Sequence, residues 1–206
     1  MQLKPLILFS GFLILVGYHT YAQSKYSPIV IDKQIKDTFS FAKKWDYSWE
    51  VFKDERTGKF TKNNSEPLKR SDTAHLFFTA NCSTNVQGGY NIRYCFAYKK
   101  NEIITLIFSD GLPAYASEFF IYIKGDSCSF KPKIIYPGYI PGQKISYEVT
   151  KQNLTLNKSA YKTGDIIIGY VDTEFTEIVS VPKEETKSHK YYLRGYVRTP
   201  LKGPGK

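Results

Sequence analysis

The stretch KYYLRGYVRT, residues 190–199, shows the pattern that decides the fold of this chain. Its odd positions carry Tyr191, Leu193, Gly195 and Val197, whereas its even positions carry tyrosine and arginine. Such alternation is typical of a β-strand that turns one face to the core and the other to solvent. We therefore predict a strand here, with an outer face that is both aromatic and basic. That face consists of Tyr192, Arg194, Tyr196 and Arg198.

Segments of the same kind recur along most of the chain. Runs rich in Val, Ile, Thr, Tyr and Phe are separated by turn residues about every 8–15 positions. Segments with helical periodicity are nearly absent. The pattern predicts one antiparallel all-β domain of about ten strands, packed as a β-sandwich, with a closed β-barrel as the alternative. The expected strands cover residues 74–80, 90–98, 102–109, 115–124, 127–136, 144–150, 153–157, 165–178 and 190–199.

The region before these strands has the same alternation. Residues 39–52 switch between apolar and polar side chains, which predicts one strand or two successive short ones. Turn-forming residues follow at positions 54–58, and a return strand is expected to begin at Phe60. A hairpin is therefore predicted in this part of the chain.

The first 22 residues have the composition of a secretory signal peptide. Lys4 precedes an apolar run that ends at Gly17 and is shorter than the about 20 residues of a membrane-spanning helix. Thr20 and Ala22 stand at the −3 and −1 positions of a cleavage site before Gln23. We expect an exported chain, periplasmic, associated with the outer membrane or extracellular, without a transmembrane segment. A single β domain is expected over residues 23–199 and a flexible basic tail over residues 200–206.

The positive charge is concentrated near one end of the chain. The formal net charge is +10, and loss of residues 1–22 removes one unit, that of Lys4. Residues 183–206 contain seven basic and two acidic side chains. This local concentration favours an anionic envelope partner over nucleic acid, for which the sequence contains no recognised module.

Three cysteines, Cys82, Cys95 and Cys128, follow the predicted cleavage site. Export would place them in an oxidising compartment, where disulfides persist. Cys82 lies just after the predicted strand 74–80 and Cys95 within the next, so a hairpin could bring them together. We predict a Cys82–Cys95 disulfide, with Cys95–Cys128 as the alternative pairing.

The sequence contains no motif that identifies a catalytic, cofactor or metal site. It has no G-x-S-x-G, no phosphate-binding glycine loop, no H-E-x-x-H and no C-x-x-C. Asp72 could orient His75 as a general base, but a loop that Asp72 closes before the strand explains the pair better. A glycosidase would need two converging carboxylates, which the sequence alone cannot place. The candidates are Asp110, Glu118, Asp126, Asp172 and Glu174.

Two features are candidates for binding. The polar loop over residues 81–89 includes Asn85 and Gln87, whose amides could bind a neutral polar ligand such as a sugar. The outer face of the last strand could stack its tyrosines on sugar rings and pair its arginines with carboxylate or sulfate. Turn chemistry in the loop and a solvated sheet face are the simpler interpretations of the same residues.

The YAQSK junction at residues 21–25 resembles that of exported Bacteroidota proteins. The stretch GDIIIGYV at residues 164–171, followed by residues 190–199, is similar to small uncharacterised β proteins that they secrete. The resemblance implies export and β structure and brings no active residue to this chain.

The sequence thus leads to three expectations about function. The first is a noncatalytic secreted or cell-envelope binding module for an acidic glycan or an envelope protein. The second is a carbohydrate-active hydrolase with an unidentified carboxylate pair. The third is a structural accessory domain of an envelope assembly.

Overall fold

A computed structural model describes residues 26–35, 39–45, 51–62, 66–69, 73, 76–109, 117–136, 138 and 140–203. Within these ranges the chain is almost entirely β, as the sequence predicts. None of the described helices has the length and apolar composition of a membrane span. The predicted signal peptide, Asp72, His75 and Asp110 lie outside the described residues.

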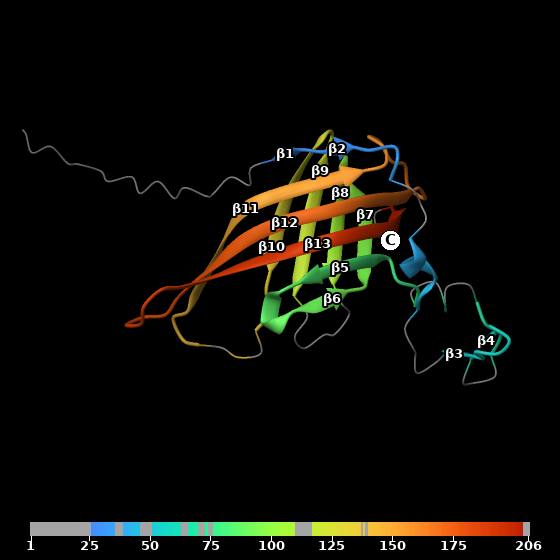
Figure 1. Ribbon diagram of the computed structural model, residues 1–206, viewed down its shortest axis with the longest axis horizontal. Helices are drawn as coiled ribbons and strands as arrows, with labels where there is room; N and C mark the ends of the chain where they lie inside the picture. The colour runs from blue at the N-terminus through green and yellow to red at the C-terminus, as the bar shows by residue number, and fades with distance from the viewer. Residues whose placement is uncertain are drawn as a thin grey trace, which may run out of the picture.

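One large sheet contains nearly all the strands (Figure 1). Its hydrogen-bonded order is β1, β10, β9, β8, β7, β13, β12, β11 and β2, and β5 pairs with both β13 and β6. A separate hairpin joins β3 (Val51–Lys53) to β4 (Phe60–Lys62). The strands of the large sheet are β1 (Ser27–Pro28), β2 (Val30–Ile31), β5 (Ala80–Thr84), β6 (Tyr90–Ile92), β7 (Tyr94–Lys100), β8 (Ile103–Ser109), β9 (Glu118–Lys124), β10 (Ser127–Lys133), β11 (Lys144–Leu156), β12 (Ile166–Ser180) and β13 (Lys187–Lys202).

The sheet folds over on itself into two layers that enclose the core. Figure 1 shows the meander β7–β10 behind β5, β11, β12 and β13, with the strands of the two layers crossing. β13 joins the layers, because its end at Leu201 and Lys202 pairs in parallel with β7. At the other side, β1 pairs with β10 and β2 pairs with β11, so the N-terminal segment nearly closes the sheet.

The core lies between the layers and consists of inward-facing side chains from both. In β13, Leu193, Val197 and Leu201 are buried, which confirms that the odd positions of this strand face inward. The largest fully buried apolar side chains are Phe108, Phe119, Phe175, Ile92, Leu106, Ile121, Leu154, Leu156, Ile167, Leu193 and Leu201. β13 runs to Lys202, beyond residue 199, the predicted end of the domain.

Two predicted strands have a different form. Residues 40–43 form the short 3₁₀ helix η1 (Ser40–Lys43) instead of a strand, with Phe41 as its buried side chain. Residues 144–150 and 153–157 were expected to be separate strands, but β11 is continuous through a β-bulge between Val149 and Lys151. The bulge shifts the alternation by one residue, so the sequence pattern resembles a break.

The predicted Cys82–Cys95 disulfide is wrong. Cys82, Cys95 and Cys128 are all free and buried. The cross-strand partner of Cys82 is Ile92 of β6, so the residue that returns opposite it comes before Cys95. Cys95 lies on β7, in the other layer, opposite Phe108 of β8. The short strand β6 and the change of layer after it could not be predicted from the spacing of the cysteines.

Candidate functional site: a groove between β10 and β11

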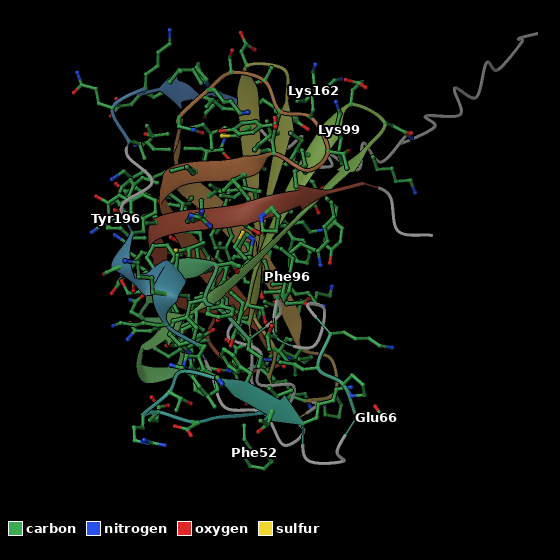
Figure 2. The ribbon with its side chains drawn as sticks, turned by 90° about the vertical axis from the view of Figure 1, so that its right-hand side faces the viewer. Phe52, Glu66, Phe96, Lys99, Lys162 and Tyr196 are labelled. Atoms are coloured by element: carbon green, nitrogen blue, oxygen red, sulfur yellow. The ribbon has the colours of Figure 1, made fainter. Side chains whose placement is uncertain are left out.

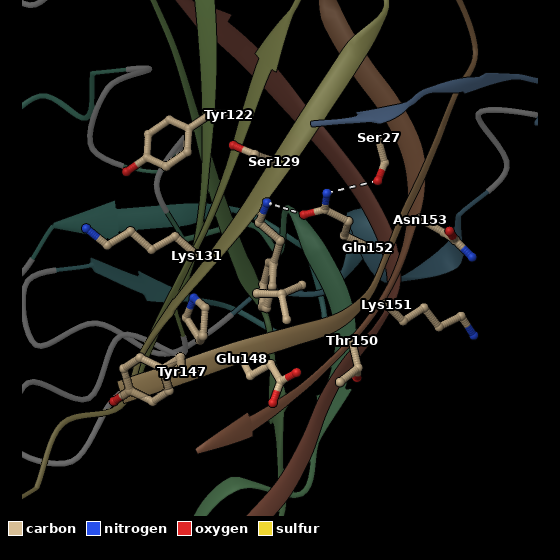
Figure 3. Close-up of a pocket in the computed structure, with 13 residues that line it drawn as sticks. Ser27, Tyr122, Ser129, Lys131, Tyr147, Glu148, Thr150, Lys151, Gln152 and Asn153 are labelled. Carbon is tan, nitrogen blue, oxygen red and sulfur yellow. Dashed lines mark hydrogen bonds between the residues drawn. The ribbon is translucent and has the colours of Figure 1, made fainter. Parts of the chain in front are cut away.

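A groove of about 1030 Å³ opens where the large sheet fails to close, between β10 and β11. In Figure 3, Tyr122, Ser129 and Lys131 come from one wall, and Glu148, Thr150 and Lys151 from the other. We call this feature the seam groove. Its full lining is Ser27, Tyr122, Ser129, Phe130, Lys131, Pro132, Tyr147, Glu148, Val149, Thr150, Lys151, Gln152 and Asn153.

The seam groove exists because two strand edges face each other without forming a ladder. β1 pairs with β10 only at Cys128 and Ser127. β2 pairs with β11 only at Thr155 and Leu156. Beyond these short contacts no described strand covers the two edges. An uncovered edge normally invites another strand, so the groups along it decide what the groove can bind.

Side chains of β11 satisfy the backbone donors that β10 turns toward the groove. The Phe130 N–H donates to Gln152 Oε1 at 3.0 Å, and the Gln152 amide donates in turn to Ser27 Oγ at 2.9 Å (Figure 3). The Ile134 N–H donates to the Tyr147 hydroxyl at 3.2 Å. Pro132, which has the same orientation between them, has no N–H to donate. This edge of β10 is therefore protected against pairing with a further strand.

The bulge in β11 places these side chains. Tyr147 and Val149 pack against the core before the bulge, and Leu154 is buried after it. The inward-facing positions therefore change from odd to even numbers, and Gln152 turns toward β10. Without the extra residue Gln152 would lie on the outer face. The bulge thus allows Gln152 to form the hydrogen bond that connects β11 to β10.

The seam groove combines aromatic, hydroxyl, amide and charged groups. Lys151 binds Asp172 through Nζ and Oδ2 at 2.6 Å, so its charge is already paired. Lys131 is exposed and forms no ion pair within the described part of the chain. Glu148 is the one carboxylate among the lining residues. A ligand in the groove would contact aromatic ring faces, many hydrogen-bonding groups and the ammonium group of Lys131.

On the predicted basic face of β13, Arg194 belongs to a network of paired charges. Arg194 Nε donates to Asp172 Oδ1 at 2.8 Å, and its Nη2 donates to Glu174 Oε1 at 3.2 Å. Burial disfavours the charged form of Asp172, but hydrogen bonds from Lys151 and Arg194 prevail and lower the pKa of its carboxyl. The guanidinium of Arg194 also lies over the Tyr192 ring, 5.5 Å from its centroid.

The two remaining residues of this face have structural contacts. The Tyr196 ring packs on Tyr170 at 4.9 Å and on Phe39 at 5.0 Å between centroids. Figure 2 shows Tyr196 beside the blue segment that holds η1. It is nevertheless 43% exposed. Arg198 is half-buried, and its backbone N–H donates to the Thr79 carbonyl at 2.9 Å.

The amides of Asn85 and Gln87 bind the protein itself. The Tyr192 N–H donates to Asn85 Oδ1 at 3.0 Å, and Asn85 Nδ2 donates to the Lys190 carbonyl at 3.1 Å. Asn85 thereby extends the pairing of β5 with β13 by one side chain. Gln87 Nε2 donates to the Ile135 carbonyl at 2.8 Å. Neither amide lies in the seam groove.

The four carboxylate candidates that the structure describes do not converge on the seam groove. Glu118 on β9 binds Lys133 at 2.6 Å, and Asp126 lies in the turn before β10. Asp172 and Glu174 share Arg194 and Lys151 on the outer face of β12. Within the described ranges, no group of three His, Cys, Asp or Glu side chains could hold a metal ion.

One buried carboxylate was not found by sequence reasoning. Glu177 of β12 is fully buried and accepts a hydrogen bond of 2.5 Å from the Tyr136 hydroxyl at Oε2. Its Oε1 has no hydrogen-bond partner among the described residues. Thr173, Phe175 and Glu177 occupy alternate positions of β12 and all face the core. This alternation was the sequence signal that could have identified Glu177 as buried. The Glu177 carboxyl attaches the segment after β10 to the core.

The seam groove also left few signals in the sequence. A proline within the predicted strand 127–136 and the interrupted alternation near residue 150 were the signals that could have indicated it. No family model, curated protein or solved structure matches the chain.

Proposed function

We propose that the chain is a noncatalytic binding module of the cell envelope and that its seam groove binds an acidic glycan. The observation that carries this proposal is the protected edge of β10. Gln152 and Tyr147 occupy the backbone donors at Phe130 and Ile134, and Pro132 has none. A peptide that added as a strand would have to displace these contacts. A ligand that binds through its hydroxyl groups and by stacking on rings could bind without displacing them.

The lining of the seam groove supports a sugar ligand. Tyr122 and Tyr147 offer ring surface, which can cover the apolar face of a sugar ring. Serine, threonine and amide side chains can exchange hydrogen bonds with its hydroxyls. Lys131 can pair with a carboxylate or sulfate group. The formal net charge of +10 would also increase the rate of encounter with an anionic polymer.

The competing functions have weaker support. A hydrolase with two catalytic carboxylates would need a second acid near Glu148, and the lining contains one carboxylate. An envelope protein could bind elsewhere, including the outer face of β13, where Arg194 already has two carboxylate partners. A purely structural domain would need no groove with an uncommitted lysine.

Glycan-array binding tests the proposal, with a parallel array of extended peptides. We expect wild-type protein to bind uronic-acid or sulfated glycans, and Lys131→Gln and Tyr122→Ala each to weaken this binding about threefold to tenfold. Lys133→Gln is the matched control, because Lys133 lies on the same face of β10 but binds Glu118 outside the groove. Arg194→Ala tests the predicted face of β13.

Three outcomes would contradict the proposal. The groove is not the binding site if Lys131→Gln and Lys133→Gln have equal effects. Selective binding to peptides would favour the envelope-protein alternative. Hydrolysis of a bound glycan would favour the hydrolase.

A further inference from the structure

Aromatic side chains of β7 and β9 lie in two rows that cross the outer face of the meander β7–β10. The rows follow from the strand registers, which pair each residue with the one beside it on the next strand. The first row consists of Phe96, Ile107, Phe120 and Lys131, and the second of Tyr98, Thr105, Tyr122 and Ser129. We call these the aromatic rows.

The aromatic rows lie on the side of the sheet away from the core. Ala97, Leu106 and Ile121, which alternate with them along the strands, are buried in the core. Phe96 is 38% exposed, and Phe120 and Tyr122 are half-buried. The Phe120 and Tyr122 rings are nearly parallel, with an angle of 8° and 6.3 Å between centroids. Neither row contributes to the enclosed core, so core packing does not explain these aromatic side chains.

The aromatic rows end in the seam groove. Tyr122, Ser129 and Lys131 belong to the rows and also line the groove. A ligand that leaves the groove at this wall therefore meets the rings of β9 and then those of β7. Crossing from β10 to β7 covers three inter-strand spacings, about 14 Å, which is longer than one sugar ring.

Lysines border the same surface. Lys100, opposite Ile103, and Lys124, on the other side of Ile103, form a further row next to Tyr98 and Tyr122. Both lysines are exposed. Rings flanked by ammonium groups suit a chain whose sugar faces are apolar and whose substituents are negatively charged.

We propose that the aromatic rows extend the seam groove into a binding path for a multi-residue acidic glycan, so that the protein prefers long chains to short ones. This inference rests on the proposed function, because the first sugars of the chain would occupy the groove. The following sugars stack on Phe120, Phe96 and Tyr98, which lie outside the groove lining. These three rings therefore contribute only to ligands that reach beyond the groove.

Calorimetric titration with oligogalacturonates of increasing length tests this inference. We expect the affinity of wild-type protein to rise with chain length. Phe96→Ala and Tyr98→Ala should each weaken binding of the long oligomers about threefold to tenfold and leave the shortest bound oligomer unchanged. Tyr196→Ala is the matched control, because Tyr196 is an aromatic residue of comparable exposure on the outer face of the other layer. Figure 2 shows it well separated from Phe96.

The outcomes separate the two proposals. If short oligomers bind through Lys131 but affinity does not rise with length, the binding path is refuted and the groove stands. The path is also refuted if Phe96→Ala and Tyr98→Ala bind long oligomers like the wild type. If no oligomer binds at any length, the groove and the path both fail for this class of glycan. Circular dichroism of each variant shows whether a loss of binding reflects a loss of folding.

Discussion

At the scale of single residues, Gln152 connects the two strand edges that border the seam groove. Its amide accepts from the Phe130 N–H and donates to Ser27 Oγ, so one side chain connects β11, β10 and β1. Gln152→Ala leaves the Phe130 N–H without this partner, and we expect the free energy of unfolding to fall by about 1–3 kcal/mol. Urea denaturation measures the change. Asn153→Ala is the control, because Asn153 is exposed, and it should change stability by less than about 0.5 kcal/mol. Equal effects would show that Gln152 does not hold the seam.

The Asp172 carboxylate makes the free energy of unfolding depend on pH. Although burial opposes its ionisation, Lys151 and Arg194 lower the pKa of its carboxyl, so its contribution is complete above the unfolded-state pKa of about 3.9. That contribution disappears as the pH falls through the lower pKa of the folded state. We expect Asp172→Asn to be less stable than wild type at pH 7 and to lose less stability on acidification. Thermal unfolding at a series of pH values measures both. Asp126→Asn should follow the wild-type profile, since Asp126 forms no ion pair within the described ranges. An unchanged acid profile in Asp172→Asn would refute this role.

At the scale of secondary-structure elements, the approach of β5 to β13 requires glycine at one position. Gly195 has a φ of +150°, and a Cβ there would collide with the Asn81 carbonyl oxygen and the Cys82 Cα. Because both obstacles are backbone, relief would require β5 to move. We expect Gly195→Ala to lower the free energy of unfolding by several kcal/mol, or to prevent folding. Thermal unfolding should show a strongly lowered melting temperature. Gly138→Ala, with no atom within 4 Å of the new Cβ, should melt like the wild type. A fully stable Gly195→Ala would mean that the two strands are further apart.

The elements also show why sequence reasoning succeeded in some places and failed in others. The alternation of β13 correctly predicted which side chains face the core, because burial on one face selects apolar residues at every second position. The same rule split β11 into two strands, since the bulge shifts the alternation. The arginines of β13 were candidates for binding a ligand. The carboxylate partners of Arg194 are Asp172 and Glu174 of β12, which lie opposite Arg194 and Tyr192. The register between two strands is not visible in the pattern of one of them.

At the scale of the whole molecule, the all-β class followed from local patterns, but the arrangement of the layers did not. The disulfide prediction failed for the same reason, because Cys82 and Cys95 belong to different layers. We expect a thiol reagent, without reductant, to label all three cysteines in the unfolded protein and hardly any in the folded protein. Burial raises the pKa of the Cys128 thiol to about 11, which slows its reaction further. Mass spectrometry counts the labels. A single label on the unfolded chain would show that a disulfide forms after all.

The position of β13 has a consequence for the order in which the fold can be completed. β13 is the last of the described strands to be synthesised, yet it pairs with β12, β5 and β7 and joins the two layers. Until it leaves the ribosome, neither layer can complete its core, and the earlier strands lack their central partner. A nascent chain of this design cannot complete its core before β13 has been made. This order of assembly would suit the export that we expect from the sequence, because a chain crosses a translocation channel before it folds.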